Sequence, residues 1–264
     1  MKILVFGDVV GRIGREGITS VLPKLRKQHG PDLVIANVEN IAHGKGISPT
    51  AMQEAFRWKA DVYTSGDHAW DNVKGLEILT DPSVPIVRPV NYPSRVPGRG
   101  WLTLRQGAWS VAVINMQGQV MFKNDPSNPF YALDEVLKEP DVAACQVKLL
   151  DFHAEATSEK RALGWYADGR LTALWGTHTH VPTADAQILP QGTGYITDVG
   201  MNGAYKSIIG QDITGPLTMF VTQLKHKFSP PTEGAVEINA LLLTIDPSQG
   251  KTTDITLIRE IHTF

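Results

Sequence analysis

The stretch "LTALWGTHTH", residues 171–180, gives the clearest indication of the fold and of the chemistry. An apolar run of strand length ends at Gly176, and His178 and His180 follow with one residue between them. Two imidazoles this close in sequence seldom serve packing, whereas imidazole is a common metal ligand. The stretch therefore predicts a buried strand whose carboxyl end carries part of a metal site.

Similar apolar runs of strand length recur along the chain. They cover residues 2–8, 32–40, 60–68, 110–118, 147–153 and 193–200. Several of them are continuously apolar, which is typical of strands that are covered on both faces. From residue 235 the pattern changes to two long β-like runs around the turn "DPSQGK", and these predict an antiparallel hairpin added to the sheet.

Helical patterns separate several of these runs. They lie at residues 14–29, 48–59, 129–139 and 158–167. Ser48 is the expected N-cap of the second helix, with Pro49 at its first position, and Ser158 is the expected N-cap of the last. Alternation of strands and helices favours an α/β fold, and no linker or repeat interrupts it. We expect one domain over residues 1–264.

Composition excludes several classes of protein. The net charge of −2 gives no general attraction for nucleic acid or for an anionic membrane surface. One cysteine, Cys145, permits no internal disulfide, and it is expected to fill space in the core. No apolar segment is long enough for a membrane span or a signal peptide. These features predict a cytoplasmic protein.

Potential metal ligands stand at the ends of five predicted strands. In open α/β sheets the carboxyl ends of the strands line the ligand crevice, so we expect these side chains to meet there. The predicted ligands are Asp8, Glu39, Asn40, Asp67, His153, His178 and His180. Any one of them alone has a simpler reading, because a lone histidine is more often a hydrogen-bonded core residue and an aspartate after a strand is often a turn former. The prediction depends on the whole set.

The set suits two metal ions better than one. Seven oxygen and nitrogen donors exceed what a single tetrahedral ion uses, and two neighbouring cations require a bridging carboxylate, for which Glu39 is the candidate. Because no sulfur donor is present, the set favours iron, manganese or zinc. Gly7, Gly66 and Gly176 lie beside the ligands, where a missing side chain allows the backbone to approach a crowded cluster.

Other motifs are absent. Neither "GDVVGRIG" nor "HGKGIS" has the spacing of a dinucleotide or phosphate loop, and there is no H-E-x-x-H sequence of the common zinc proteases.

The order "GD", "EN", "GDH", a lone histidine and "GTHTH" instead resembles the metallophosphoesterase superfamily. The longer stretches "ENIAHGKG", "RPVNYP", "DFHAEATSEKRALGWYADGR", "GTHTHVPTAD" and "YITDVGM" resemble its bacterial YmdB-like subfamily over nearly the whole chain.

This resemblance implies a four-layer α/β/β/α sandwich, a dinuclear metal centre and 2′,3′-cyclic nucleotide phosphodiesterase activity. It implies that one metal is held by Asp8, Glu39, Asn40 and His180, and the other by Glu39, Asp67, His153 and His178. His68 would act beside the metals as acid or transition-state donor. Two departures stand out: Val10 replaces the histidine of the usual D-x-H motif, and Asp67 stands where the subfamily usually has asparagine.

The mechanism expected from this site is attack of a metal-bridging hydroxide on phosphorus while His68 stabilises or protonates the leaving oxygen. The substrate would be a small nucleotide or phosphodiester. Glu155 and Asp198 are candidate partners of the imidazoles, and Arg88, Asn91 and Gln117 are candidates for the substrate face. Beyond these candidates the sequence identifies no substrate-binding residue.

Three rival interpretations stay open at this stage. One is a phosphomonoesterase or nuclease built on the same metal centre. Another is a metal-bearing regulatory protein with vestigial catalysis. The third is a structural protein whose histidines at the strand ends bind no metal. Aromatic residues expected at the surface around 91–93 and 164–166 also leave room for a homo-oligomer interface.

Overall fold

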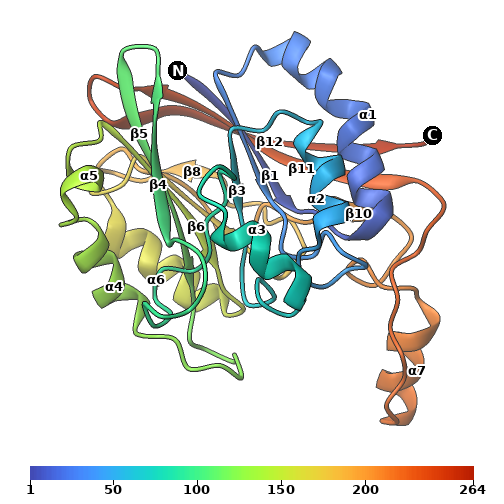
Figure 1. Cartoon of the computed structure of the whole chain (residues 1–264). Helices are drawn as coiled ribbons and strands as arrows, with labels where there is room; N and C mark the ends of the chain where they lie inside the picture. Colours follow the sequence, from blue (N-terminus) through green and yellow to red (C-terminus); the bar gives the residue numbers. More distant parts are fainter.

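Two six-stranded sheets pack face to face in the computed structural model, which describes residues 1–264 (Figure 1). In the first sheet the order is β10-β11-β1-β2-β3, and β12 pairs with β11. Its strands are β1 (Lys2–Asp8), β2 (Leu33–Asn37), β3 (Val62–Thr64), β10 (Gly203–Ala204), β11 (Val236–Asp246) and β12 (Lys251–His262). The antiparallel pairing of β11 with β12 confirms the predicted C-terminal hairpin.

The second sheet has the order β4-β5-β6-β7-β9-β8, with β5, β6, β7 and β9 parallel. Its strands are β4 (Trp101–Gln106), β5 (Trp109–Gln117), β6 (Val147–His153), β7 (Ala173–Thr177), β8 (Gln187–Ile188) and β9 (Gly194–Ile196). Because β6 and β7 run parallel in register, His153 lies beside Thr177 at the same edge of the sheet.

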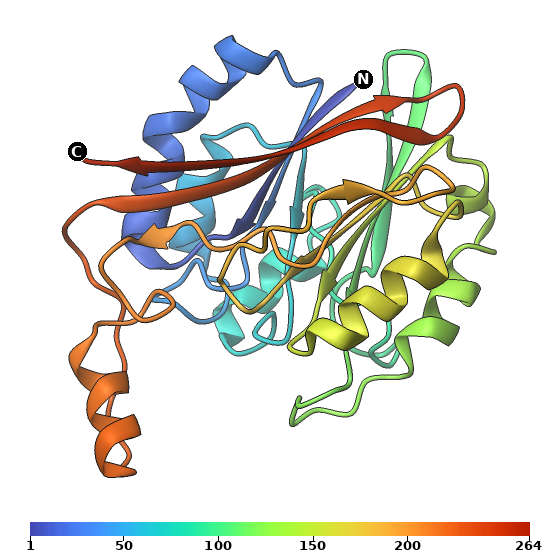
Figure 2. The ribbon, with the colours of Figure 1, turned by 180° about the vertical axis from the view of Figure 1, so that it is seen from behind.

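Helices cover the outer face of each sheet. Over the first sheet lie α1 (Gly11–His29), α2 (Pro49–Phe56) and α3 (Leu76–Thr80), the last preceded by the 3-10 turn η1 (Val73–Gly75). Over the second lie α4 (Pro129–Val136), α5 (Pro140–Ala143) and α6 (Thr157–Ala167). The remaining helix, α7 (Thr214–Thr222), projects away from the body of the molecule (Figures 1 and 2).

Of the two predicted helix N-caps, the structure confirms one. Ser48 caps α2 by accepting a hydrogen bond from the Ala51 backbone N–H, and Pro49 opens the helix, as predicted. The prediction for Ser158 is wrong, because α6 begins at Thr157 and Ala156 stands at the N-cap without a side-chain bond. No helix in the structure combines the length and the apolar character needed to cross a lipid bilayer.

Three apolar layers account for the architecture. One joins the first sheet to α1, α2 and α3, and another joins the second sheet to α4, α5 and α6 and includes Cys145, as expected. The middle layer lies between the two sheets, where Ile3, Val5, Leu149, Trp175 and other side chains are fully buried. The four-layer α/β/β/α sandwich that the family resemblance implies is therefore confirmed.

Trp175 tests the importance of the middle layer for stability. Its side chain is fully buried and its indole N–H has no hydrogen-bond partner. We predict that Trp175→Ala lowers the free energy of unfolding by about 3–5 kcal/mol through the cavity it leaves. Trp175→Phe should cost less, since it keeps an aromatic ring, leaves a smaller cavity and also removes an unpaired N–H. Urea denaturation of both variants measures the difference, and equal losses would contradict this packing.

Candidate metal centre

All seven predicted ligands converge at one edge of the sandwich. Asp8 ends β1, and Glu39 and Asn40 follow β2. Asp67 follows β3, His153 ends β6, and His178 and His180 follow β7. The first three strands belong to one sheet and the last two to the other, so the site lies where the two sheets meet.

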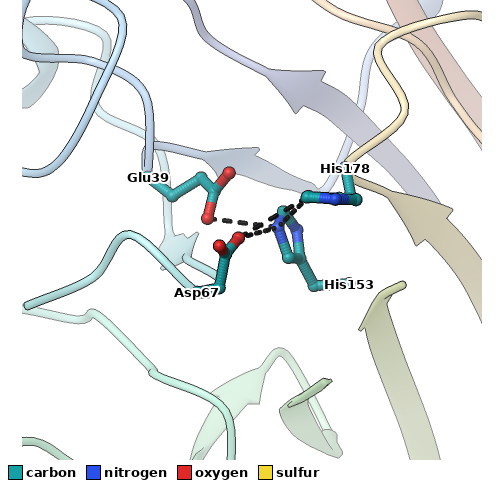
Figure 3. Close-up of side chains that lie close together, drawn as sticks. All are labelled: Glu39, Asp67, His153 and His178. Atoms are coloured by element: carbon teal, nitrogen blue, oxygen red, sulfur yellow. Dashed lines mark hydrogen bonds and ion pairs between the residues drawn. The ribbon is translucent and has the colours of Figure 1, made fainter. Parts of the chain in front are cut away.

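The acidic and imidazole side chains form two groups with one common member. Glu39, Asp67, His153 and His178 place one potential ligand atom each within 4.8 Å of one another, and so do Asp8, Glu39 and His180. Figure 3 shows the first group, with the four side chains pointing toward one another. Glu39 belongs to both groups, as the sequence predicts for a bridging carboxylate.

His153 lies at the middle of the first group. Its Nε2 atom is 3.1 Å from Glu39 Oε2, 3.2 Å from Asp67 Oδ1 and 3.0 Å from His178 Nδ1. His153 and Glu39 are both fully buried. Four donor atoms from four different segments thus face one small volume, as ligands of a single ion do.

The second group contains an unpaired buried oxygen. Asp8 is fully buried, and its Oδ1 atom has no hydrogen-bond partner, although Oδ2 accepts from the His178 backbone N–H. A buried carboxylate oxygen without a partner is costly unless a cation satisfies it. Asn40 lies against the group, with Nδ2 2.8 Å from Glu39 Oε1 and 3.1 Å from His180 Nε2. The donor set therefore fits a metal ion.

Each histidine is held by a partner on its other ring nitrogen. His153 Nδ1 lies 2.9 Å from Thr177 Oγ1, and that hydroxyl donates to Asp151 Oδ1 at 2.6 Å. His178 Nε2 lies 3.1 Å from Glu155 Oε2, as the sequence predicts for Glu155. These contacts orient the remaining nitrogen of each ring toward the cluster, which is how metal-binding histidines are usually fixed.

The third histidine is oriented by the backbone of a distant segment. His180 Nδ1 donates to the carbonyl oxygen of Ile209 at 2.9 Å, which leaves Nε2 directed at Asn40 and Asp8. The backbone φ angles of His178 and His180 are +97° and +65°, in the left-handed region that L-residues seldom adopt. Such strain persists only where the surrounding structure enforces it, and it is common at functional sites.

Burial and neighbouring charges shift the pKa values of several groups in and beside the cluster. Burial by itself would lower the pKa of His153, yet the charges and hydrogen bonds of Glu39 and Asp67 raise it well above its usual value. Burial and the neighbouring His153 lower the pKa of His178 to about 3. Burial raises the pKa of Asp151 to about 6. Carboxylates crowded this closely favour any cation that can enter.

Asp198 has a different role from the one expected. Its carboxylate contacts no imidazole: it accepts from Lys160 Nζ at 2.6 Å and from the Thr179 hydroxyl at 2.8 Å. Lys160 and Asp198 are both fully buried. Because Thr179 separates the two histidines, the buried ion pair holds the turn that carries them.

The ligand side chains leave room only for glycine at position 66. A Cβ atom at this position would overlap Glu39 Oε2 and the ring of His153. Similarly, a Cβ atom at Gly7 or Gly176 would overlap a backbone carbonyl. These clashes agree with the close backbone approach that the three glycines predict.

His68 lies at the rim of the site rather than within either ligand group. Its Nδ1 atom is 2.8 Å from Asp71 Oδ2, its side chain is partly exposed, and it lines the same pocket as Glu39 and His180. Sequence reasoning missed Asp71, although the spacing of three residues in "HAWD" was a usable sign. Asp71 orients the ring so that Nε2 stays free for a ligand.

The candidates for the substrate face do not line this pocket. Arg88 donates to the carbonyls of Pro89, Val90 and Val96, and Asn91 donates to those of Gln117 and Ser127. Gln117 is fully buried and accepts from the Tyr92 hydroxyl. The side chains of Arg88 and Asn91 therefore hold backbone carbonyls, and assigning these two residues to the substrate face was wrong. Gln117 ends β5 beside His153, and its Nε2 atom has no hydrogen-bond partner, so its place on the substrate face stays a prediction.

The four-layer sandwich with carboxylate and imidazole ligands at the strand ends defines a protein of the metallophosphoesterase type. The same fold occurs in a 5′-nucleotidase from Candida albicans, with a TM-score of 0.54 at 12% identity over 98% of this chain and 50% of that one. More specifically, the chain belongs to the YmdB-like protein family, whose model matches residues 4–258.

Full-length relatives support this membership. A Bacillus subtilis protein named 2′,3′-cyclic-nucleotide 2′-phosphodiesterase is 42% identical over 267 residues, covering 100% of this chain and 99% of its own. The crystal structure of a hypothetical protein from Thermus thermophilus superposes with a TM-score of 0.91 at 39% identity, covering 99% of both chains. The likeness thus extends over the whole sandwich.

Thr177 tests how His153 is oriented. We predict that Thr177→Val, which removes the hydroxyl between His153 and Asp151, weakens metal binding by about 10–100-fold, the usual effect of losing such a partner. Thr197→Val is the matched control, because that buried hydroxyl donates to Asp185 instead. Titration with Mn²⁺ followed by calorimetry measures both. An unchanged affinity in Thr177→Val would show that the hydroxyl does not position the ring.

Proposed function

We propose that the protein is a dinuclear-metal phosphodiesterase that hydrolyses 2′,3′-cyclic nucleotides. The observation that carries this proposal is the position of Glu39, which is shared by two groups of potential ligands. One ion would be held by Asp8, Glu39, Asn40 and His180, and the other by Glu39, Asp67, His153 and His178. The name of the Bacillus subtilis relative supports the cyclic phosphodiester as substrate.

The donor set favours iron or manganese and also suits zinc, because it mixes carboxylate oxygen with imidazole nitrogen and contains no sulfur. When bound, a pair of cations neutralises the phosphate and lowers the pKa of a bound water to about 7, far below its value in bulk water. The chain contributes the geometry: Thr177, Glu155 and the Ile209 carbonyl fix the three imidazoles before substrate arrives. Preorganised ligands need no rearrangement during the reaction.

His68 is the proposed general acid. Hydrolysis of a cyclic phosphodiester adds water to phosphorus and breaks one ring P–O bond, so the departing oxygen must gain a proton. His68 Nε2 is free, since Nδ1 faces Asp71, and the side chain lines the pocket beside the ligand groups. The contact with Asp71 also fixes the orientation of the ring toward the pocket.

A panel of esters tests the proposed reaction. Protein purified without chelator should contain close to two metal ions per chain and turn over 2′,3′-cyclic nucleotides faster than 3′,5′-cyclic nucleotides, monoesters or RNA. Elemental analysis and steady-state kinetics provide the two readouts. Preferred turnover of a monoester or of RNA would instead favour the phosphomonoesterase or nuclease interpretation. Full metal occupancy without any turnover would favour a regulatory protein.

His68 tests the acid step separately. We predict that His68→Ala keeps its metal but loses roughly 100-fold or more in kcat on a cyclic nucleotide, the usual contribution of general acid–base catalysis. His29→Ala serves as a control, because His29 lies at the end of α1, outside the pocket. Wild-type kcat in His68→Ala would remove this residue from the mechanism.

A further inference from the structure

The pocket over the metal centre is divided into a polar floor and an apolar wall. It has a volume of about 370 Å³, within the usual range for small-molecule sites. The floor contains Glu39, Asn40, His68, His178 and His180. The apolar lining comes entirely from one later segment: Ile208, Ile209, Pro216, Met219, Phe220 and Phe228. With metal ions bound at the floor, the ligand that best fills this pocket is anionic at one end and apolar at the other.

That later segment, residues 208–230, forms the α7 arm. It consists of α7 and the chain that returns beside it, and it stands out from the body of the molecule in both ribbon views (Figures 1 and 2). The Asp212 N–H donates to the Ser229 carbonyl at 2.8 Å and closes the base of the arm. Ile209, at the same base, accepts the hydrogen bond from His180, so the wall is attached directly to the floor.

The two aromatic side chains of the wall are exposed. Phe220 is 72% exposed and Phe228 is 40% exposed, and neither ring stacks on another aromatic side chain of the protein. Large apolar side chains exposed beside a polar cluster are typical of a binding site. Flat heterocycles stack on such rings, and stacking tolerates different bases because every base has a π-face.

We propose that Phe220 and Phe228 of the α7 arm bind the base of the substrate while its cyclic phosphate occupies the floor of the pocket. This inference rests on the proposed phosphodiesterase function. It assigns recognition of the base to the α7 arm. The arm gives the enzyme its preference for a nucleotide over a cyclic phosphodiester that has no base. Because stacking tolerates all four bases, the preference for any one base is weak.

Steady-state kinetics on two substrates test whether the α7 arm binds the base. The substrates are 2′,3′-cyclic AMP and glycerol 1,2-cyclic phosphate, which has the same five-membered phosphodiester ring but no base. We predict that Phe220→Ala and Phe228→Ala each raise KM for cyclic AMP by roughly 5- to 150-fold, the range that base–aromatic stacking spans. The KM for the glycerol ester should stay unchanged, and wild-type protein should prefer cyclic AMP.

Leu217→Ala and Val221→Ala are matched controls, because both side chains are exposed on the same helix but do not line the pocket. Their KM values should equal those of wild type. Unchanged KM for cyclic AMP in both phenylalanine variants would overturn the inference and leave the phosphodiesterase intact. An equal rise in all four variants, with a changed sedimentation coefficient, would also overturn it, because the arm would then act through subunit assembly. Absence of turnover on either ester by wild type would refute the proposed function itself.

Discussion

The structure depends on one electrostatic constraint: three carboxylates, Asp8, Glu39 and Asp67, lie around His153, and all but Asp67 are fully buried. Such a group is unfavourable by itself, since each charge loses hydration and the charges repel one another. The unpaired Asp8 Oδ1 and the raised pKa of His153 are two consequences of the same imbalance. Bound cations would remove both, and the surrounding hydrogen bonds keep the donors in place for them.

The sandwich explains how ligands so far apart in sequence meet. Asp8, Glu39 and Asp67 follow strands of one sheet, whereas His153, His178 and His180 follow strands of the other. The apolar layer between the sheets fixes the two strand edges relative to each other, so packing in the core determines the distance between carboxylates and imidazoles. The α7 arm is then added above this rigid floor, joined to it through His180 and Ile209.

Much of this arrangement was predictable from the sequence, because strand periodicity and polar residues at strand ends are local signals. They gave the α/β class, the C-terminal hairpin and the seven side chains that the structure brings together. Partners set by tertiary packing were not predictable in this way. Asp151 and Thr177 lie on neighbouring strands, and the Ile209 carbonyl is a backbone group with no residue signature. Arg88 and Asn91 were misjudged because sequence cannot show that nearby carbonyls already occupy them. The apolar face of the α7 arm was not recognised either.

The central claim is that Glu39 joins two cation sites, and anomalous diffraction from crystals grown with Mn²⁺ tests it most directly. The account predicts two anomalous peaks roughly 3.5–4 Å apart, the usual spacing in such centres, with a carboxylate oxygen of Glu39 in contact with both. One peak should lie against Asp8 and His180, and the other against His153 and His178. A single peak, or two peaks that Glu39 does not contact, would contradict it.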